Sequence, residues 1–250
     1  MTKILLCGAN GKMGQAVSRV VSQKPDIEII AGYDISSVSS ASFPVYTDFS
    51  DICEKPDVII DFSHPSLTDG ILDYATINKI PAVICTTGLS ADQISRIEYE
   101  SKNIPIFFSA NMSLGINLIM DLVTKAAKIL QDDFDIEIIE KHHNLKLDAP
   151  SGTALAIADN ISEAISYTPE YTYDRHSVRK KRDKQEIGIH AVRGGTIVGE
   201  HSVIFAGNDE VIEIKHSATS KEVFAVGAVS AAEFLKDQPA GFYNMKNLIK

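Results

Sequence analysis

Apolar runs alternate with amphipathic stretches through the first half of the chain. The runs are short and continuously apolar, and they cover Lys3–Cys7, Ile27–Asp34, Asp57–Phe62, Pro81–Thr87 and Pro105–Ala110. Between most of them, apolar residues recur at helical spacing, over Met13–Gln23, Ser66–Lys79 and Ala91–Lys102. Continuous apolar strands separated by helices are typical of a parallel sheet covered on both faces. This half of the chain predicts a doubly wound α/β domain.

The second half of the chain follows a different pattern. Helices are predicted over Leu114–Leu130 and from the Pro-Ser-Gly-Thr turn to about Ile165, with a strand at Ile136–Glu140 between them. Three strand-like runs follow with little helix between them, at Glu186–Val192, Ile197–Phe205 and Glu210–His216. Runs of strands after βα alternation indicate a second domain of α+β type. We expect a final helix, Glu222–Lys236, to end the regular structure.

Charge narrows the choice of partners. The formal net charge of −9 disfavours nucleic acid and anionic membranes, because the overall field repels both. The basic run Arg179–Lys184 is more typical of a solvated loop than of a nucleic-acid patch in so acidic a chain. Any anionic ligand must therefore be bound by local positive groups.

Length and cysteine usage indicate the compartment. With 250 residues and 44% hydrophobic content, the chain can bury a core as one large domain or two smaller ones. No apolar run approaches the ~20 residues of a membrane span, and the apolar run after Met1 is too short for a signal peptide. The three cysteines form no C-x-x-C pair, so neither a disulfide framework nor a zinc site is suggested. We expect a cytoplasmic protein without a bound metal.

A glycine-rich turn follows the first predicted strand. Gly8, Gly11 and Gly14 form G-x-x-G-x-x-G, a variant of the dinucleotide fingerprint, and Met13 opens a helix. Glycines allow backbone N–H groups to approach a pyrophosphate, whose charge the helix N-terminus then stabilises. A merely tight βα turn is the alternative. The preceding strand and the following helix favour dinucleotide binding.

Asp34 ends the second predicted strand about 20 residues beyond Gly14, where a ribose-binding acid belongs. Its carboxylate would accept hydrogen bonds from the ribose hydroxyls and repel a 2′-phosphate, which favours NADH over NADPH. Ile35 supplies no compensating charge, but Lys12 in the glycine turn would partly offset the repulsion. NADPH therefore stays a possible cofactor.

Two later strand ends fit the same site, because ligands bind at the carboxyl ends of the strands in open parallel sheets. They are C-T-T-G at Cys85–Gly88 and S-A-N-M at Ser109–Met112. Cys85 raises the alternative of a catalytic thiol, as in aldehyde dehydrogenases. We interpret it as a buried, unreactive cysteine, since no neighbouring base is evident in the sequence.

Chemically capable side chains are densest at Glu140–Ala154, E-K-H-H-N-L-K-L-D-A-P-S-G-T-A. Neighbouring side chains of a strand point to opposite faces, so His142 and His143 can face one ligand only if the strand breaks there. This disfavours a metal pair. The S-G-T segment is predicted to enter a helix N-terminus, whose N–H groups would bind a carboxylate together with the hydroxyls of Ser151 and Thr153. A plain N-cap and histidines without a function are the alternatives.

Together these groups predict a site for a small polyanion. The helix N-terminus, His143 and Lys146 would hold it, while His142 or Lys146 supplies a proton. A lysine is protonated near neutral pH, so it can donate as negative charge develops on a substrate. The arrival of hydride from a nicotinamide creates such charge.

The same segment resembles the signature of the dihydrodipicolinate reductase family, E-x-H-H-x-x-K-x-D-A-P-S-G-T-A. The resemblance covers essentially the whole chain and includes the glycine turn, both strand ends, R-G-G-x-I-V-G-E-H at Arg193–His201 and F-A-x-G-A at Phe224–Ala228. It implies a Rossmann-type dinucleotide-binding domain at residues 1–112 plus 220–250. It also implies a substrate-binding and oligomerisation domain built on a mixed sheet at residues 113–219, and a homotetramer formed through those sheets.

The resemblance implies a reaction and roles for single residues. The reaction is the reduction of 4-hydroxy-tetrahydrodipicolinate to 2,3,4,5-tetrahydrodipicolinate, with loss of water, in the diaminopimelate route to lysine. His142 and Lys146 would be the acid–base pair, and Lys146 would protonate the ring carbon next to the hydride acceptor. The substrate would be bound by His143, Ser151, Gly152 and Thr153. The dinucleotide would be bound by Gly8, Ala9, Asn10, Gly11, Lys12, Met13, Asp34, Cys85, Thr86, Thr87, Ser109, Ala110, Asn111 and Met112.

Two positions depart from the family's pattern. Cys85 stands where glycine is common. Lys221 stands where arginine is common at the hinge after the substrate domain, and lysine lacks the planar guanidinium fork of arginine.

Two rival functions make different predictions. A different two-domain dehydrogenase would lose turnover on Cys85→Ser, whereas the roles given above predict that turnover is lost on His142→Gln. A non-catalytic dinucleotide sensor would bind NADH without oxidising it.

Overall fold

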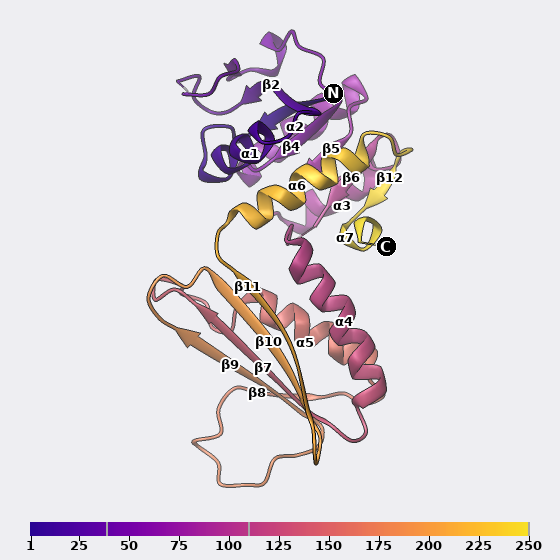
Figure 1. The fold of residues 1–250 in the computed structure, drawn as a ribbon. Helices are drawn as coiled ribbons and strands as arrows, with labels where there is room; N and C mark the ends of the chain where they lie inside the picture. The colour runs from indigo at the N-terminus through magenta and orange to yellow at the C-terminus, as the bar shows by residue number, and fades with distance from the viewer. Residues whose placement is uncertain (39, 110, 250) are drawn as a thin grey trace. The chain divides into compact units, whose positions relative to one another are not determined.

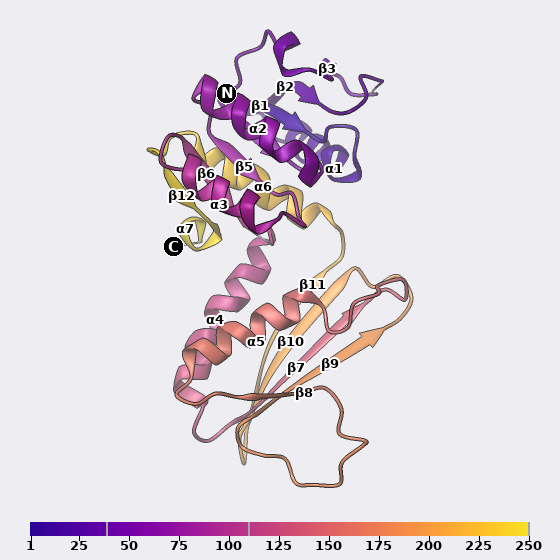
Figure 2. The same ribbon diagram turned by 180° about the vertical axis from the view of Figure 1, so that it is seen from behind.

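The computed structural model describes residues 1–38, 40–109 and 111–249, and the chain divides into two units. The first unit is Met1–Leu114 together with Lys221–Lys250, and the second is Gly115–Ser220. Each unit has its own sheet and its own buried side chains (Figures 1 and 2). Within the described residues, no helix is long and apolar enough to cross a membrane.

The first unit is built on a seven-stranded sheet in the order β12-β6-β5-β4-β1-β2-β3, and all its strand pairs are parallel. The strands β1, β4 and β5 are buried almost throughout, because helices cover both faces. The predicted doubly wound sheet is therefore confirmed. The strands are β1 (Thr2–Cys7), β2 (Ile27–Tyr33), β3 (Val45–Tyr46), β4 (Val58–Asp61), β5 (Ala82–Ile84), β6 (Pro105–Phe108) and β12 (Gly241–Tyr243).

Helices cover both faces of this sheet. Ile4 and Leu6 of β1 belong to the apolar cluster that contains α1 and α6, whereas Leu5 and Cys7 belong to the one that contains α2 and α3. This alternation is the expected consequence of a strand whose successive side chains point to opposite faces. The helices are α1 (Lys12–Ser22), α2 (Pro65–Asn78), α3 (Ala91–Glu100) and α6 (Glu222–Leu235).

The prediction that regular structure ends with the helix from Glu222 is wrong. Strand β12 follows α6 and pairs with β6 at the edge of the sheet, and the short helix α7 (Met245–Leu248) comes after it. The sequence analysis also missed β3, the 3₁₀ helix η1 (Phe49–Asp51) and β8 (Glu170–Thr172) of the second unit. These segments are only two to four residues long and carry no measurable periodicity.

The second unit is built on a five-stranded mixed sheet in the order β11-β10-β7-β9-β8. Strand β7 pairs in parallel with β9 and antiparallel with β10, which confirms the mixed sheet. The helices α4 (Leu114–Leu130) and α5 (Gly152–Ala164) lie on one face of it (Figures 1 and 2). The other strands are β7 (Asp135–His142), β9 (Glu186–Arg193), β10 (Gly199–Ala206) and β11 (Val211–Ala218).

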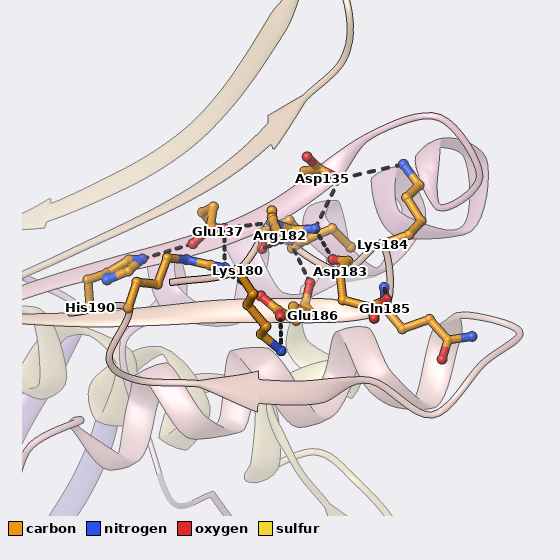
Figure 3. A network of polar contacts seen from close by, with 11 residues as sticks. Asp135, Glu137, Lys180, Arg182, Asp183, Lys184, Gln185, Glu186 and His190 are labelled. Carbon is orange, nitrogen blue, oxygen red and sulfur yellow. Dashed lines mark hydrogen bonds and ion pairs between the residues drawn. The ribbon is translucent and has the colours of Figure 1, made fainter. Parts of the chain in front are cut away.

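The basic run Arg179–Lys184 lies in the loop before β9, and part of it is anchored to the sheet rather than solvated. The side chain of Arg182 is only 18% exposed, and its guanidinium nitrogens lie 3.0 Å from Oδ1 of Asp135 and 3.0 Å from Oε1 of Glu137 (Figure 3). It also donates to the backbone carbonyl of Glu186 at 2.6 Å. These acidic partners explain the basic residues without any nucleic acid.

Acid should weaken the second unit through Glu186, whose side chain is fully buried between Lys180 and Arg175 at 3.0 and 2.7 Å. The bond from Lys180, supported by Arg175, outweighs burial and lowers the pKa of Glu186 from 4.5 to about 2. A lowered pKa in the folded state adds stability that is fully present above pH 4.5 and is lost as the pH falls towards 2.

The variant Glu186→Gln should therefore unfold at lower urea concentration than the wild type at pH 7, and this gap should narrow between pH 4.5 and 2. Urea unfolding midpoints across that range would measure it. Glu163→Gln, at an exposed position of α5, serves as the control and should leave the midpoints nearly unchanged. A gap that stays constant with pH would contradict this assignment.

Candidate active site

The turn between β1 and α1 excludes side chains by its backbone geometry. Gly8 has φ +77°, and a Cβ there would lie 2.5 Å from the carbonyl oxygen of Phe62. A Cβ at Gly14 would overlap the carbonyl oxygen of Gly8 and lie 2.6 Å from that of Ala9. The N-cap of α1 is Gly11, which brings no side-chain oxygen to the first N–H groups of the helix. This cradle fits a pyrophosphate at a helix N-terminus.

Asp34 lies directly after β2 and contacts the glycine turn. Its Oδ2 accepts a hydrogen bond from the backbone N–H of Asn10 at 2.9 Å, and the amide of Asn10 donates to the carbonyl of Ser36 at 2.7 Å. Lys12 is exposed at the start of α1, while Met13 packs against the apolar cluster. The predicted ribose acid and the predicted phosphate turn are thus neighbours.

The loops after β4 and β5 are joined by the carboxylate of Asp61, which is fully buried. Asp61 accepts hydrogen bonds from the Ser63 backbone N–H and from the Thr86 hydroxyl, both at 2.8 Å. Burial raises the pKa of Asp61, and these two hydrogen bonds oppose the rise. Thr86 is thereby fixed, while its neighbour Thr87 is exposed. Asp61 was not among the residues predicted from the sequence.

Cys85 lies in the environment of an unreactive thiol. The residue is 6% exposed, and its backbone N–H donates to the carbonyl of Asp61 at 2.9 Å. Burial, with a smaller contribution from the charge of Asp61, raises the pKa of Cys85 well above its ordinary value. A neutral, buried thiol is a poor nucleophile, which argues against the rival dehydrogenase chemistry at this residue.

The segment after β6 contributes mainly backbone to this edge of the sheet. The Ser109 hydroxyl donates to the carbonyl of Asn111 at 3.0 Å, and the Asn111 side chain accepts from the Ser113 N–H at 2.9 Å. The side chain of Met112 is buried in the apolar cluster, which leaves no side-chain surface there for a ligand. Ala110, also predicted to bind the dinucleotide, lies outside the described residues.

The predicted substrate residues lie at the carboxyl end of β7 and the start of α5. The strand ends at His142, and a turn follows in which the Lys146 N–H donates to the carbonyl of His143 at 3.2 Å. His143 therefore leaves the strand, which removes the geometric objection to both histidines serving one site. Ser151 caps α5 by accepting from the Ala154 N–H at 3.2 Å, so its hydroxyl is a true N-cap.

The start of α5 leaves room for an anion. Gly152 is exposed, and a Cβ there would meet no atom within 4 Å among the described residues. Thr153 follows in the first turn and is half-buried. Helix N-termini stabilise anions through their free N–H groups and the helix dipole.

Glu140 links these parts, although the sequence analysis gave it no role. Its carboxylate has no exposed surface; Oε2 lies 2.6 Å from Nδ1 of His142, and Oε1 accepts from the Ser151 N–H at 3.0 Å. Both nitrogens of the Arg193 fork donate to it, at 2.8 and 2.7 Å. Burial would raise the pKa of Glu140, but the bonds from Arg193, His142 and Ser151 outweigh it and lower the pKa.

His201 lies on β10 opposite Glu140 and was also missed as an individual site residue. It is 4% exposed, its Nε2 lies 3.1 Å from the Ser151 hydroxyl, and its ring meets that of His142 edge-to-face at 5.2 Å. Burial, followed by the charge of His142, lowers the pKa of His201 to about 4, so this ring is neutral at pH 7. His201 therefore contributes packing against His142 and a hydrogen bond with Ser151, but no charge.

Lys146 and Asp148 form an ion pair in the loop between β7 and α5. Lys146 Nζ lies 2.9 Å from Oδ1 of Asp148, and the two side chains are 22% and 57% exposed. The bond from Lys146 lowers the pKa of Asp148. Because the partner carboxylate is exposed, separating the two side chains costs little free energy.

Comparisons with known proteins agree over almost the whole chain. Residues 2–112 match the family described as dihydrodipicolinate reductase, N-terminus, and residues 115–249 match dihydrodipicolinate reductase, C-terminus. A 4-hydroxy-tetrahydrodipicolinate reductase from Clostridium tetani is 54% identical over 98% of this chain and 96% of its own. One from Caldanaerobacter subterraneus subsp. tengcongensis is 52% identical over 100% of this chain and 99% of its own.

A solved structure shares the fold. It is described as a dipicolinate-bound dihydrodipicolinate reductase from Paenisporosarcina sp. TG-14, and it matches with a TM-score of 0.83 over 99% of both chains. Its sequence identity is 24%, so this likeness concerns the fold alone.

Proposed function

The chain belongs to the dihydrodipicolinate reductase family, and on that premise we propose that it reduces 4-hydroxy-tetrahydrodipicolinate to 2,3,4,5-tetrahydrodipicolinate with NAD(P)H. This is a step of the diaminopimelate route to lysine. The observation that carries the proposal for this chain's own residues is the array around Glu140, which ties His142 to the N-terminus of α5.

The first unit would bind the dinucleotide. The glycine turn accepts no Cβ at Gly8 or Gly14, which suits a backbone that lies against a pyrophosphate. Asp34 would accept hydrogen bonds from the adenosine ribose, and the loops held by Asp61 would border the nicotinamide half. When bound, the reduced nicotinamide supplies the hydride.

The second unit would bind the dicarboxylate and deliver the proton. Gly152 and Thr153 at the start of α5 would bind one carboxylate, while Ser151 would fix this helix N-terminus as its cap, and His143 is nearby in sequence at the other end of the loop. The 4-hydroxyl group must first leave as water to give the conjugated ring, and addition of hydride to that ring then leaves negative charge on it. The ammonium of Lys146 would protonate the carbon next to the hydride acceptor, and His142 would complete the acid–base pair.

A coupled assay tests this function. The purified chain is mixed with freshly made product of dihydrodipicolinate synthase, and nicotinamide absorbance is followed with NADH and with NADPH. We expect oxidation of the cofactor that depends on both the chain and the synthase product. Tight NADH binding with no oxidation under these conditions would instead support the dinucleotide sensor.

The proposed preference for NADH depends on the charge of Asp34. Asp34→Asn keeps an oxygen that can accept from the Asn10 N–H but removes repulsion of a 2′-phosphate. We expect the ratio of kcat/KM for NADPH to that for NADH to rise about tenfold or more, since unit charges about 4 Å apart interact by ~1–4 kcal/mol. Initial rates with each cofactor measure the ratio.

Asp57→Asn is the matched control for this variant. Its carboxylate also accepts a backbone N–H, that of Lys3 at 2.8 Å, but it lies at the amino end of the sheet's strands. Its cofactor ratio should equal that of the wild type. An unchanged ratio in Asp34→Asn would remove Asp34 from cofactor selection.

We also propose that the chain forms a homotetramer through the sheet of the second unit. The face of this sheet that α4 and α5 leave uncovered carries Ile139, Val192, Ile204 and Val211. Val192 and Val211 are 44% and 65% exposed, which favours burial against another copy. Light scattering of the purified chain would give the mass directly.

A further inference from the structure

The loop that carries His142 and Lys146 is held at both ends by one buried carboxylate. Glu140 contacts Nδ1 of His142, where the loop begins, and the backbone N–H of Ser151, where it ends. We propose that Glu140, fixed by Arg193, is the positioning residue that sets the tautomer and orientation of His142 for proton transfer. This inference rests on the function proposed above.

The tautomer follows from the short contact with Glu140. A carboxylate only accepts hydrogen bonds, so Nδ1 of His142, at 2.6 Å, carries the hydrogen. Nε2 is then the nitrogen that exchanges a proton with a ligand. Gly199 of β10 leaves room beside it, because a Cβ there would lie 3.1 Å from Nε2. The strand alternation that puts Glu140 and His142 on one face makes this contact possible.

Arg193 keeps the buried carboxylate charged and connects it to the rest of the loop. Its fork binds both oxygens of Glu140, a geometry that only arginine provides. One of its nitrogens also donates to the backbone carbonyl of Asp148 at 2.6 Å, and the side chain of Asp148 holds Lys146. Arg193 thus links the supports of both predicted proton-transfer residues.

The same strand supplies a matched control. Glu137 on β7 forms a second array of glutamate, arginine and histidine, with Arg182 at 3.0 Å and His190 Nε2 at 2.8 Å, on the opposite face of the sheet (Figure 3). It has the same chemistry without the loop. A variant there reports what loss of such an array does to stability and assembly without changing the loop.

The test compares Glu140→Gln with Glu137→Gln. A glutamine amide can donate to Nδ1 of His142, which would move the ring hydrogen to Nε2. We expect Glu140→Gln to lower kcat by about 10²–10⁴-fold, the usual size of general acid–base catalysis, with the KM for the dicarboxylate within about threefold. Glu137→Gln should keep kcat within about threefold of the wild type.

A second measurement needs no turnover. Nitrogen-15 NMR of the imidazole rings, with the His142 signals assigned through His142→Gln, should show hydrogen on Nδ1 in the wild type and a shift towards Nε2 in Glu140→Gln. This measurement does not require the substrate, so it can show that the inference fails even if the proposed function is correct, and the reverse. An unchanged His142 tautomer, or an unchanged kcat, would overturn the inference.

Arg193→Lys covers the case in which Glu140→Gln does not fold. It keeps the positive charge but loses the fork, and we expect kcat to fall at least about tenfold at nearly constant KM. A wild-type kcat in a folded Arg193→Lys would count against the inference. If both variants were unfolded, the role of Glu140 and Arg193 would be to stabilise the fold, and the inference would be overturned as well.

Discussion

Lys146→Ala is expected to lower kcat by about 10²–10⁴-fold while leaving NADH binding nearly unchanged. The reason is that the ammonium would deliver the proton that follows hydride addition. In the loop between β7 and α5, this ammonium pairs with the exposed carboxylate of Asp148, which a substrate carboxylate could replace. The residues proposed to bind the dinucleotide belong to the first unit, whereas Lys146 belongs to the second. Steady-state rates in the coupled assay and a fluorescence titration of NADH would measure both quantities.

Two companion variants define what Lys146 contributes. Lys146→Arg keeps the charge but replaces a proton donor by a guanidinium that stays protonated, so it should not restore turnover if proton transfer is the role. Lys125→Ala removes another lysine of the second unit that pairs with a carboxylate, Asp121 at 2.6 Å, and should be as active as the wild type. A wild-type kcat in Lys146→Ala would exclude Lys146 from the mechanism.

Gly14→Ala is expected to weaken dinucleotide binding by about 5–150-fold, which corresponds to the ~1–3 kcal/mol that overpacking usually costs. The added methyl would overlap the carbonyl oxygen of Gly8 and crowd that of Ala9, and both are backbone atoms of the turn. The start of α1 would have to move away from β1, and the phosphate cradle would widen. Titration of NADH fluorescence gives the affinity, and urea unfolding shows how much of the strain lowers stability.

Gly70→Ala is the control for this substitution. Gly70 lies within α2, and a Cβ there would meet only Phe49 at an ordinary 3.6 Å. Alanine is the better helix former by ~0.5–1 kcal/mol, so this variant should be slightly more stable and bind NADH like the wild type. If Gly14→Ala bound NADH as tightly as Gly70→Ala, the turn would not be the phosphate site.

The sequence determined the parts of the fold that depend on local pattern. Strand β1 is buried on both faces over residues 4–7 and is continuously apolar there, and the helix that follows it has an apolar stripe. Strand β12 carries no such signal, because its three residues are stabilised as a strand only by pairing with β6. A short edge strand forms because it pairs with an adjacent strand, and the periodicity of the sequence does not show which segments lie next to each other.

The same division holds for the candidate site. The glycine turn and the residues from His142 to Thr153 were evident because their chemistry is concentrated in short segments. Strand alternation alone would have placed Glu140 beside His142. Arg193 and His201 were beyond such reasoning, because β9 and β10 bring them to Glu140 and Ser151 across 53 and 50 positions of the chain. The charge and hydrogen-bond partners of a buried group depend on which strands lie next to it, and only the tertiary structure decides that.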